Sequence, residues 1–555
     1  MIKSKIISSL DKALPNGNFD DYRECDHLTV LRGERASFQL IYEFDNPTPP
    51  VFARALSVTL SGNLAEYTTL HNVMSVPATG NARATTDEDY ITTKPAIIPD
   101  VLTPLQFQGK LMAVPGALRS AWIDVEIPED VYIPEGELTI TLTHTPKFSH
   151  DQPFSVTLSL TVETLNARLP EQTLIFTQWF HHDCLANYYK VEKWSDEHFR
   201  IIENFVKCAK RAGINMLYTP LITPPLDNSY DTRDLQLADV TVTDGGYEFG
   251  WEKLDRWIDI LDRVGIKYME MGHLFTQGGA EYATKVSGDV NGEYKRLFPA
   301  DTPCDDPEYT KFLRALLISF ISHMKERGDD GRMIFHISDE PPESLIETYQ
   351  RAKSTVADIL EGYEIFDALS DYDFYERGIV KRPIVILNAL HKFVGRTEKG
   401  LWTYNCCGPS SGYSNRFIAM TLSRNRSISL LLYKYNIEGF LHWGYNFYNT
   451  AGSSDFINPF LDTSAGGVFP SGDAFSVYPG DGGKPLESMR LVSFKQGLDD
   501  LSAYKLCESL YSKEEVISAL EDELGAEIQT TTYINDSEKM QRVRDRINAM
   551  IKARL

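Results

Sequence analysis

Two adjacent carboxylates follow a short apolar run in the middle of the chain. The segment MIFHISDEPP covers residues 333–342 and ends in Asp339, Glu340 and two prolines. Proline donates no backbone N–H, so the two prolines end a strand and fix the acids at its rim. A carboxyl group beside a second carboxylate has a raised pKa, which suits a general acid, and we predict that Glu340 protonates a leaving group. The alternative is that Asp339 caps the following helix while Glu340 is solvated.

The adjacency of the two acids limits the mechanisms they can serve. In a retaining glycosidase the carboxylate nucleophile and the acid flank the scissile bond about 5 Å apart, usually from different strands. Neighbours on one strand rarely give this opposed placement. A carboxylate beside the acid is better used to orient a nucleophile of the substrate, the oxygen of a 2-acetamido group. Asp339 would then hold the amide N–H, a tyrosine the carbonyl, and an aromatic pocket the methyl group.

The elements that must position the pair change character near residue 170. Before it, apolar residues alternate with polar ones in segments such as 121–127, 138–142 and 154–162. This period of two predicts half-buried antiparallel strands and a β-sandwich. After ARLPEQT (167–173), short apolar runs alternate with amphipathic helical stretches.

The later apolar runs number eight, which is the strand count of a (β/α)8 TIM barrel. A doubly wound sheet is the alternative, but no GxGxxG or P-loop motif follows any run. The connections after the fifth and sixth runs are expected to hold only a turn of helix. The predicted runs are 173–180, 214–220, 266–274, 332–340, 363–371, 382–390, 400–407 and 437–448.

The predicted fold class is therefore α/β, with an amino-terminal antiparallel β-sandwich followed by a (β/α)8 barrel. We place the sandwich at residues 1–168 and the catalytic barrel, with a carboxy-terminal helical segment, at 169–512. Residues 513–555 are expected to form terminal helices packed on the barrel.

Aromatic and polar residues gather where the predicted barrel strands end, which is where such barrels carry their sites. Aromatic faces beside amides and imidazoles suit a sugar ring, although any one of them alone is more often a packing residue. Tyr404 and Tyr445 each follow a tryptophan by two residues, and either could hold the acetamido carbonyl, with Tyr404 slightly favoured. The predicted substrate-binding residues are Trp179, His181, His273, Asn388, Trp402, Tyr404, Trp443, Tyr445 and Asn446.

A metal site at His181, His182 and Asp183 is the alternative use of that polar run. Adjacent residues on a strand point to opposite faces, so only one histidine could reach an ion, and we predict no metal and no cofactor. The seven cysteines show no metal-like spacing and are expected to be free thiols.

The overall charge limits the partners. A net charge of −23 disfavours nucleic acid and anionic membranes, and is compatible with a neutral carbohydrate. No apolar run is long enough to span a membrane, and the amino terminus lacks a signal-peptide pattern, so we expect a cytoplasmic location. The oligomeric state is not assigned.

The chain resembles glycoside hydrolase family 123, the β-N-acetylgalactosaminidases, over nearly its whole length. The resemblance implies a β-sandwich joined to a (β/α)8 barrel, and retention through the acetamido group, with Asp339 as the assisting carboxylate and Glu340 as the acid/base. It also implies terminal β-linked GalNAc of glycans such as those of glycosphingolipids as the substrate. The motifs that carry it are GERASFQL (33–40), HISDEP (336–341), LWTYNCCGP (401–409), GFLHWGYNFYN (439–449), YPGDGGKP (478–485) and MRLVSFKQGLDDLSAYKL (489–506).

Two other functions remain open from the residues. One is a two-carboxylate retaining glycosidase with Glu340 as the acid and Glu270 or Asp371 as the nucleophile. The other is a non-catalytic glycan-binding barrel, which is disfavoured because two neighbouring buried acids are costly to desolvate. The choice between GalNAc and GlcNAc lies in contacts to the 4-hydroxyl, which the sequence does not assign.

Overall fold

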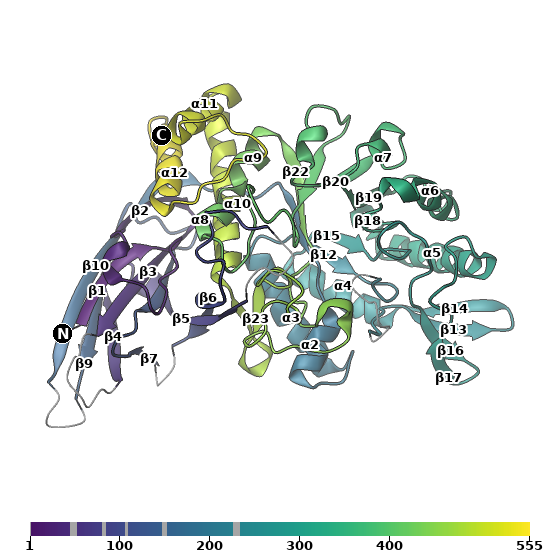
Figure 1. The fold of residues 1–555 in the computed structure, drawn as a ribbon, viewed down its shortest axis with the longest axis horizontal. Helices are drawn as coiled ribbons and strands as arrows, with labels where there is room; N and C mark the ends of the chain where they lie inside the picture. The colour runs from purple at the N-terminus through teal and green to yellow at the C-terminus, as the bar shows by residue number, and fades with distance from the viewer. Residues whose placement is uncertain (1, 45–52, 80–84, 106–108, 147–151, 226–232) are drawn as a thin grey trace.

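The chain folds into an amino-terminal sandwich, a closed barrel and a set of carboxy-terminal helices (Figure 1). The sandwich and the barrel lie side by side, and the carboxy-terminal helices lie against both. The structure is a computed structural model that describes residues 2–44, 53–79, 85–105, 109–146, 152–225 and 233–555.

The sandwich consists of two five-stranded sheets, with strand orders β1-β3-β8-β5-β6 and β2-β10-β9-β4-β7. The expected half-buried alternation is confirmed in β9 and β10, whereas β8 is buried on both of its faces. The inward residues of all three strands form the core between the sheets. The strands are β1 (Ile2–Ser8), β2 (His27–Arg32), β3 (Arg35–Phe44), β4 (Arg54–Ser61), β5 (Thr68–Ala78), β6 (Ala96–Pro104), β7 (Lys110–Ala113), β8 (Arg119–Glu126), β9 (Glu135–His144) and β10 (Phe154–Arg168).

One strand pair of the sandwich departs from the antiparallel prediction. β2 runs parallel to β10, with Thr161 opposite His27. The reason is that the chain crosses to the second sheet after β1, so its second strand lies beside the last strand of the domain rather than beside a hairpin neighbour.

Eight parallel strands in chain order close into a barrel, as the sequence predicts. Each lies within the apolar run expected for it. The barrel strands are β11 (Ile175–Gln178), β12 (Met216–Thr219), β15 (Tyr268–Met271), β18 (Met333–Phe335), β19 (Glu364–Leu369), β20 (Arg382–Ile386), β21 (Leu401–Tyr404) and β22 (Ile437–His442).

Helices cover the barrel unevenly, so the (β/α)8 prediction holds for the strands but not for every helix. The fully described connection between β20 and β21 contains only the 3-10 turn Leu390–Lys392. The helices are α2 (His182–Tyr189), α3 (Asp196–Arg211), α4 (Glu252–Val264), α5 (Pro307–Arg327), α6 (Ile346–Ser354), α7 (Asp373–Glu376), α8 (Leu422–Arg426), α9 (Ile428–Lys434), α10 (Met489–Leu510), α11 (Lys513–Leu524) and α12 (Ser537–Lys552).

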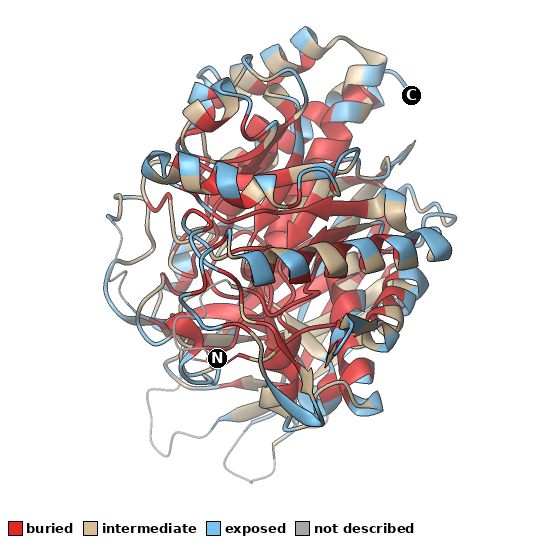
Figure 2. Ribbon diagram, turned by 90° about the vertical axis from the view of Figure 1, so that its right-hand side faces the viewer, coloured by how far each residue is buried: buried red, intermediate tan, exposed pale blue. Residues whose placement is uncertain are grey.

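The start and end of α5 follow from local chemistry. The Asp306 carboxylate accepts the N–H groups of Glu308 and Tyr309, Pro307 occupies the first turn, and Gly328 ends the helix with a left-handed φ of 78°. On this side of the molecule the helices expose one face and bury the other against the barrel (Figure 2).

Two small sheets lie outside the predicted elements. One is four-stranded, in the order β14-β13-β16-β17, and extends from the end of the molecule farthest from the sandwich (Figure 1). The other joins β23 to β24. Their strands are β13 (Asp239–Thr243), β14 (Gly246–Gly250), β16 (Ser287–Val290), β17 (Glu293–Arg296), β23 (Val477–Pro479) and β24 (Pro485–Glu487).

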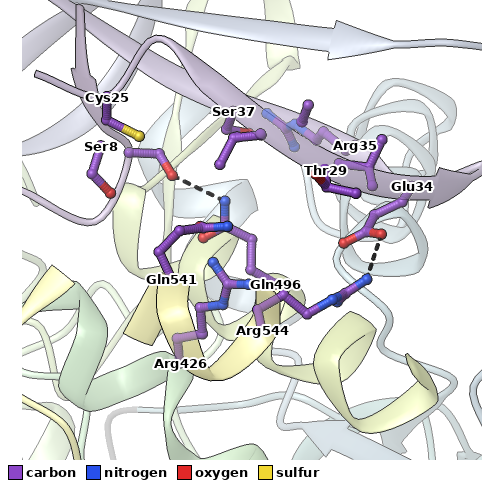
Figure 3. A pocket seen from close by; sticks show the side chains of 14 residues that line it. Ser8, Cys25, Thr29, Glu34, Arg35, Ser37, Arg426, Gln496, Gln541 and Arg544 are labelled. Carbon is purple, nitrogen blue, oxygen red and sulfur yellow. Dashed lines mark hydrogen bonds and ion pairs between the residues drawn. The ribbon is translucent and has the colours of Figure 1, made fainter. Parts of the chain in front are cut away.

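Buried ion pairs join the carboxy-terminal helices to the sandwich. Arg490 of α10 donates to Asp100 of β6, with 2.9 Å between Nε and Oδ1. Arg544 of α12 binds Glu34, between β2 and β3, at 2.7 Å (Figure 3). It also binds Asp500 of α10 at 3.0 Å. The terminal helices therefore pack on the sandwich as well as on the helices of the barrel.

Candidate active site

The acid pair lies just beyond β18, at the carboxyl end of the barrel. β18 ends at Phe335, and the next helical turn has Pro342 as its N-cap residue, with no side-chain capping bond. The alternative in which Asp339 caps that helix is therefore wrong. Asp339 is only 8% exposed, whereas the neighbouring Glu340 is exposed to solvent.

The backbone at the pair is strained and firmly held. Glu340 has a φ of 43°, in the left-handed region, which costs a residue with a Cβ roughly 1–2 kcal/mol. Its N–H donates to the carbonyl of Ala368 at 3.1 Å, and Gly278 N–H donates to the carbonyl of Asp339 at 2.7 Å. Strained residues fixed in this way are concentrated at functional sites.

The two carboxyl groups differ in their surroundings. Burial, and next the charge of Glu340, raise the pKa of Asp339 well above its usual range, against the opposing charge of His336. The Tyr404 hydroxyl donates to Oε1 of Glu340. Burial and the Glu340 carboxylate raise the pKa of Tyr404, so its hydroxyl keeps its proton and serves as a donor.

A chain of buried charges lies beneath the pair. The His336 ring stands between two carboxylates, with Nε2 3.0 Å from Oε1 of Glu270 and Nδ1 3.4 Å from Oδ1 of Asp367. Burial acts to lower the pKa of His336, but these two carboxylates outweigh it and raise the pKa to about 10. Glu270 also accepts from the Thr177 hydroxyl and, at 2.6 Å, from Nε1 of Trp179.

A metal ion at His273, His336 and Asp367 is an alternative use of this cluster. Their ligand atoms lie within 4.8 Å of one another. The two rings are stacked, with centroids 4.6 Å apart and 28° between their planes. A protonated His336 between two carboxylates has no lone pair to give, and we derive no step through a metal.

Aromatic rings line the interior of the barrel below the pair. Trp179 lies against Tyr218, whose hydroxyl contacts Nδ1 of His273 at 3.2 Å. Trp402 is 1% exposed and packs on Phe366, with ring centroids 4.6 Å apart. Trp179 therefore lies beside the polar cluster at the mouth, whereas Trp402 packs in the apolar interior of the barrel.

Trp443, just beyond β22, is partly buried and forms one wall of the candidate site. Its Nε1 donates to Oδ2 of Asp473 at 3.0 Å. Burial raises the pKa of Asp473 to about 7 despite the opposing charge of Arg416, and Glu340 adds to the increase. Asp473 therefore lies within the electrostatic reach of the acid pair and fixes the orientation of the indole.

His181 supports this wall rather than facing a ligand. Arg233 binds the Asp183 carboxylate through two bonds of 2.9 Å, and its Nη2 lies 3.3 Å from Nδ1 of His181. Burial, and next the Arg233 charge, lower the pKa of His181 to about 3, so the ring is neutral. Its Nε2–H then donates to the carbonyl of Trp443 at 3.0 Å.

Three predicted binding residues lie elsewhere. The Tyr445 hydroxyl donates to the carbonyl of Phe205 at 2.8 Å, in the layer between the barrel and α3. The side-chain amide of Asn446 accepts the backbone N–H of His181 and donates to its carbonyl. Asn388 is exposed in the turn after β20. The structure thus groups Tyr404, Trp179 and Trp443 around the acid pair, and leaves these three outside that group.

Three residues of the site were not foreseen in their roles: Asp367, Asp473 and Arg233. Asp367 stands inside the apolar run 363–371, and a charged residue in a buried strand is a visible signal. Asp473 lies in a loop rich in glycine and serine, and Arg233 follows a segment with no regular pattern. Neither residue therefore had a sequence signal that could have identified it.

A parallel barrel with a strained acid pair and aromatic rings at its carboxyl end defines a glycoside hydrolase. The sequence profile described as "Glycoside hydrolase 123, catalytic domain" matches residues 179–507, more than half of the chain. The protein therefore belongs to glycoside hydrolase family 123. A search of curated proteins found no match.

A solved structure shows the same fold over the whole chain. The chain is similar to a family 123 glycoside hydrolase from Clostridium perfringens, studied for glycolipid glycan hydrolysis, with a TM-score of 0.76, 16% identity, and coverage of 100% of this chain and 99% of that one. An endo-β1,6-glucanase matches with a TM-score of 0.36 and 12% identity over 61% of this chain and 78% of its own.

Proposed function

We propose that the protein is an exo-acting, retaining β-N-acetylgalactosaminidase that uses the acetamido group of its substrate as the nucleophile. Its substrates would be glycans with a terminal β-linked GalNAc, such as those of glycosphingolipids. Membership of family 123 supports the glycosidase class, and the glycolipid glycan hydrolysis named for the Clostridium perfringens relative supports the substrate.

The observation that carries the mechanism is that both alternative nucleophiles are already engaged. Glu270 is fully buried, accepts from Thr177 and Trp179, and lies 3.0 Å from Nε2 of His336. Asp371 accepts the backbone N–H of Glu343 at 3.2 Å. Asp339 and Glu340, in contrast, stand together in one strained turn, which supports the substrate-assisted route.

The acid pair would hold one proton between its two members. Burial favours the neutral form of Asp339 in the free enzyme, since it raises the pKa of that carboxyl. The ionised form of Asp339 is the stronger acceptor for an acetamido N–H, so substrate binding favours the arrangement in which Glu340 carries the proton. Glu340 is then a general acid, oriented by Tyr404.

The chemical steps then balance within the site. Glu340 gives its proton to the glycosidic oxygen as the C1–O bond breaks, and the acetamido oxygen bonds to C1 to form an oxazolinium ion. Asp339 accepts the N–H of this cation, whose charge develops only in the transition state. Glu340, now a carboxylate, removes a proton from water as the water oxygen attacks C1. The bond from C1 to the acetamido oxygen breaks in the same step, the acetamide is restored, and the product keeps its β configuration.

Turnover of aryl glycosides tests this function. We expect the aryl β-N-acetylgalactosaminide to be hydrolysed and the aryl β-galactoside, which lacks the acetamido group, to be inert. Proton NMR of the first product should show the β anomer. Comparison with the aryl β-N-acetylglucosaminide tests the sugar specificity. Equal turnover of the galactoside would refute the acetamido nucleophile, and no turnover of any of the three would refute the enzyme assignment.

A further inference from the structure

The chain leaves the barrel sheet directly before the acid pair. β18 pairs with β19 only as far as Phe335, which stands opposite Ile365. Ile337 and Ser338, two and three residues further along the chain, are fully buried. Their backbone N–H groups are beyond the ladder and need acceptors of another kind, because a buried N–H without a partner is strongly disfavoured.

One carboxylate replaces the missing part of the ladder. Oδ1 of Asp367, in β19, accepts the N–H of Ile337 at 2.9 Å and that of Ser338 at 3.3 Å. Oδ2 accepts the hydroxyl of Tyr349 from α6. Two successive N–H groups turned toward one anion form a nest, in which a negative charge holds the backbone in a turn.

A negative charge suits this set of contacts. The Asp367 oxygens face two backbone N–H groups, a tyrosine hydroxyl and the His336 ring. Asparagine could keep its oxygen on the two N–H groups and donate its NH₂ to the Tyr349 oxygen, but it would lose the charge that holds the nest. The exposed fraction of Asp367 is 0%, so water does not take the place of the carboxylate.

The same strand also holds the far end of the turn. The N–H of Glu340 donates to the carbonyl of Ala368, the residue after Asp367. The segment 337–340 is therefore fixed to β19 at two points, directly before the strained φ of Glu340. From this geometry we propose that Asp367 is a positioning residue, whose carboxylate holds the turn that presents Asp339 and Glu340 to the substrate.

The proposal concerns the proposed hydrolase reaction but is separable from it. Asp367 does not touch the substrate; it acts through the backbone of residues 337–340. Its loss should misplace both acids, and a misplacement of about 1 Å can cost on the order of 10²-fold in rate. Substrate binding by the remaining contacts should change little, so the effect should fall on kcat rather than on KM.

The direct test compares Asp367→Asn with Asp124→Asn. Asp124 is an equally buried carboxylate in the sandwich, and it accepts from Ser37, Trp122 and Arg35. On an aryl β-N-acetylgalactosaminide we expect Asp367→Asn to lower kcat by about 10²-fold with KM within about threefold, and Asp124→Asn to leave both unchanged. Equal effects of the two substitutions, measured per folded enzyme, would overturn the proposal.

A milder variant and a readout without substrate complete the test. Tyr349→Phe removes one donor to Asp367 and should lower kcat by about threefold to tenfold. Hydrogen exchange of the Ile337 and Ser338 amides should accelerate in Asp367→Asn and stay slow in Asp124→Asn. If exchange is unchanged and Tyr349→Phe keeps full kcat, Asp367 does not hold the turn. If exchange accelerates while the wild type hydrolyses no aryl glycoside, the positioning stands and the proposed function fails.

Discussion

Two pairs of buried carboxylates in this molecule carry their charge in opposite ways. In the sandwich, Asp100 and Asp124 each bind a guanidinium group. At the mouth of the barrel, Asp339 and Asp473 are also buried, and within the described part of the chain neither carboxylate is hydrogen-bonded to a guanidinium group.

The difference shows in proton affinity. Burial alone would raise the pKa of Asp100 and of Asp124, but Arg490 and Arg35 outweigh it, and both pKa values are lowered. Burial is not outweighed at Asp339 and Asp473, whose pKa values are raised. A carboxylate that binds a guanidinium group stays ionised and stabilises the fold. A buried carboxylate without such a partner binds a proton more tightly, as a group that takes part in proton transfer must.

The largest expected effect is at the barrel mouth. Glu340→Gln should lower kcat on a natural glycan by about 10²–10⁴-fold, because a poor leaving group depends on the acid. An activated aryl glycoside needs little protonation and should lose far less. Steady-state kinetics on both substrates measures the difference, and equal losses would remove Glu340 from the role of the acid.

In the sandwich, a substitution that removes the guanidinium partner should lower stability and leave the catalytic rate unchanged. Arg35→Met leaves the Asp124 charge buried without its guanidinium, which should lower the free energy of unfolding by about 3–5 kcal/mol. Denaturant titration measures this loss. The kcat of the folded variant should equal that of the wild type, since Arg35 binds Asp124 and Glu487 rather than the site; a large fall in kcat would end the division into two regions.

Asp339→Asn should act mainly on the transition state. Charge on the acetamido nitrogen develops only as the oxazolinium ring closes, so kcat should fall by about 10²–10³-fold while product binding changes little. Kinetics with calorimetric titration of GalNAc separates the two quantities. A variant that retains more than about a tenth of the wild-type kcat would show that Asp339 is structural.

The two tyrosines offer a matched pair. Tyr404→Phe removes the donor to Glu340, a bond to a charged group, and should lower kcat by roughly tenfold or more. Tyr445→Phe removes only a bond to a backbone carbonyl behind the barrel wall and should leave kcat unchanged. If the Tyr445 variant is the slower of the two, the placement of these residues in the site is wrong.

The smallest effect concerns stability and pH. A raised pKa in the folded state means that Asp339 destabilises the protein increasingly as pH rises above its unfolded value near 4. Asp339→Asn should therefore be about 0.5–2 kcal/mol more stable than the wild type at pH 7, and no more stable below pH 4. Asp124, with a lowered pKa, contributes stability that is lost as pH falls below about 4. Thermal melts of the wild type and the two Asn variants between pH 3 and 7 measure both pH dependences of stability, which should have opposite signs.

The elements that follow simple periodicity were predictable. The alternation along β9 and β10 depends on a few adjacent residues and is confirmed. β8 is instead buried on both faces, because Trp122 on its outer face packs into the core that includes the barrel. The parallel pair of β2 and β10 depends on which sheet the chain enters next, which no local pattern contains. The four-stranded sheet likewise joins two separate insertions of the barrel.

At the site, sequence reasoning was limited by where strands end. Tyr404 and Tyr445 have the same spacing from a tryptophan, but β21 extends through Tyr404 while β22 stops at His442. Alternation no longer fixes the direction of Tyr445, which turns behind the barrel. Asp367 was visible as a charge in an apolar strand, but its partners on α6 and beyond β18 could be found only in three dimensions.

The central claim is that the nucleophile is the acetamido oxygen of the substrate, and that Asp339 and Glu340 assist its attack on C1. Aryl β-N-acetylgalactosaminides carrying zero to three fluorines on the acetyl methyl group test this most directly, because fluorine makes the acetamido oxygen a weaker nucleophile without altering the leaving group. The account predicts a steep fall in kcat/KM with each fluorine in the wild type. A rate independent of fluorine number would contradict it and return the nucleophile to a carboxylate of the protein.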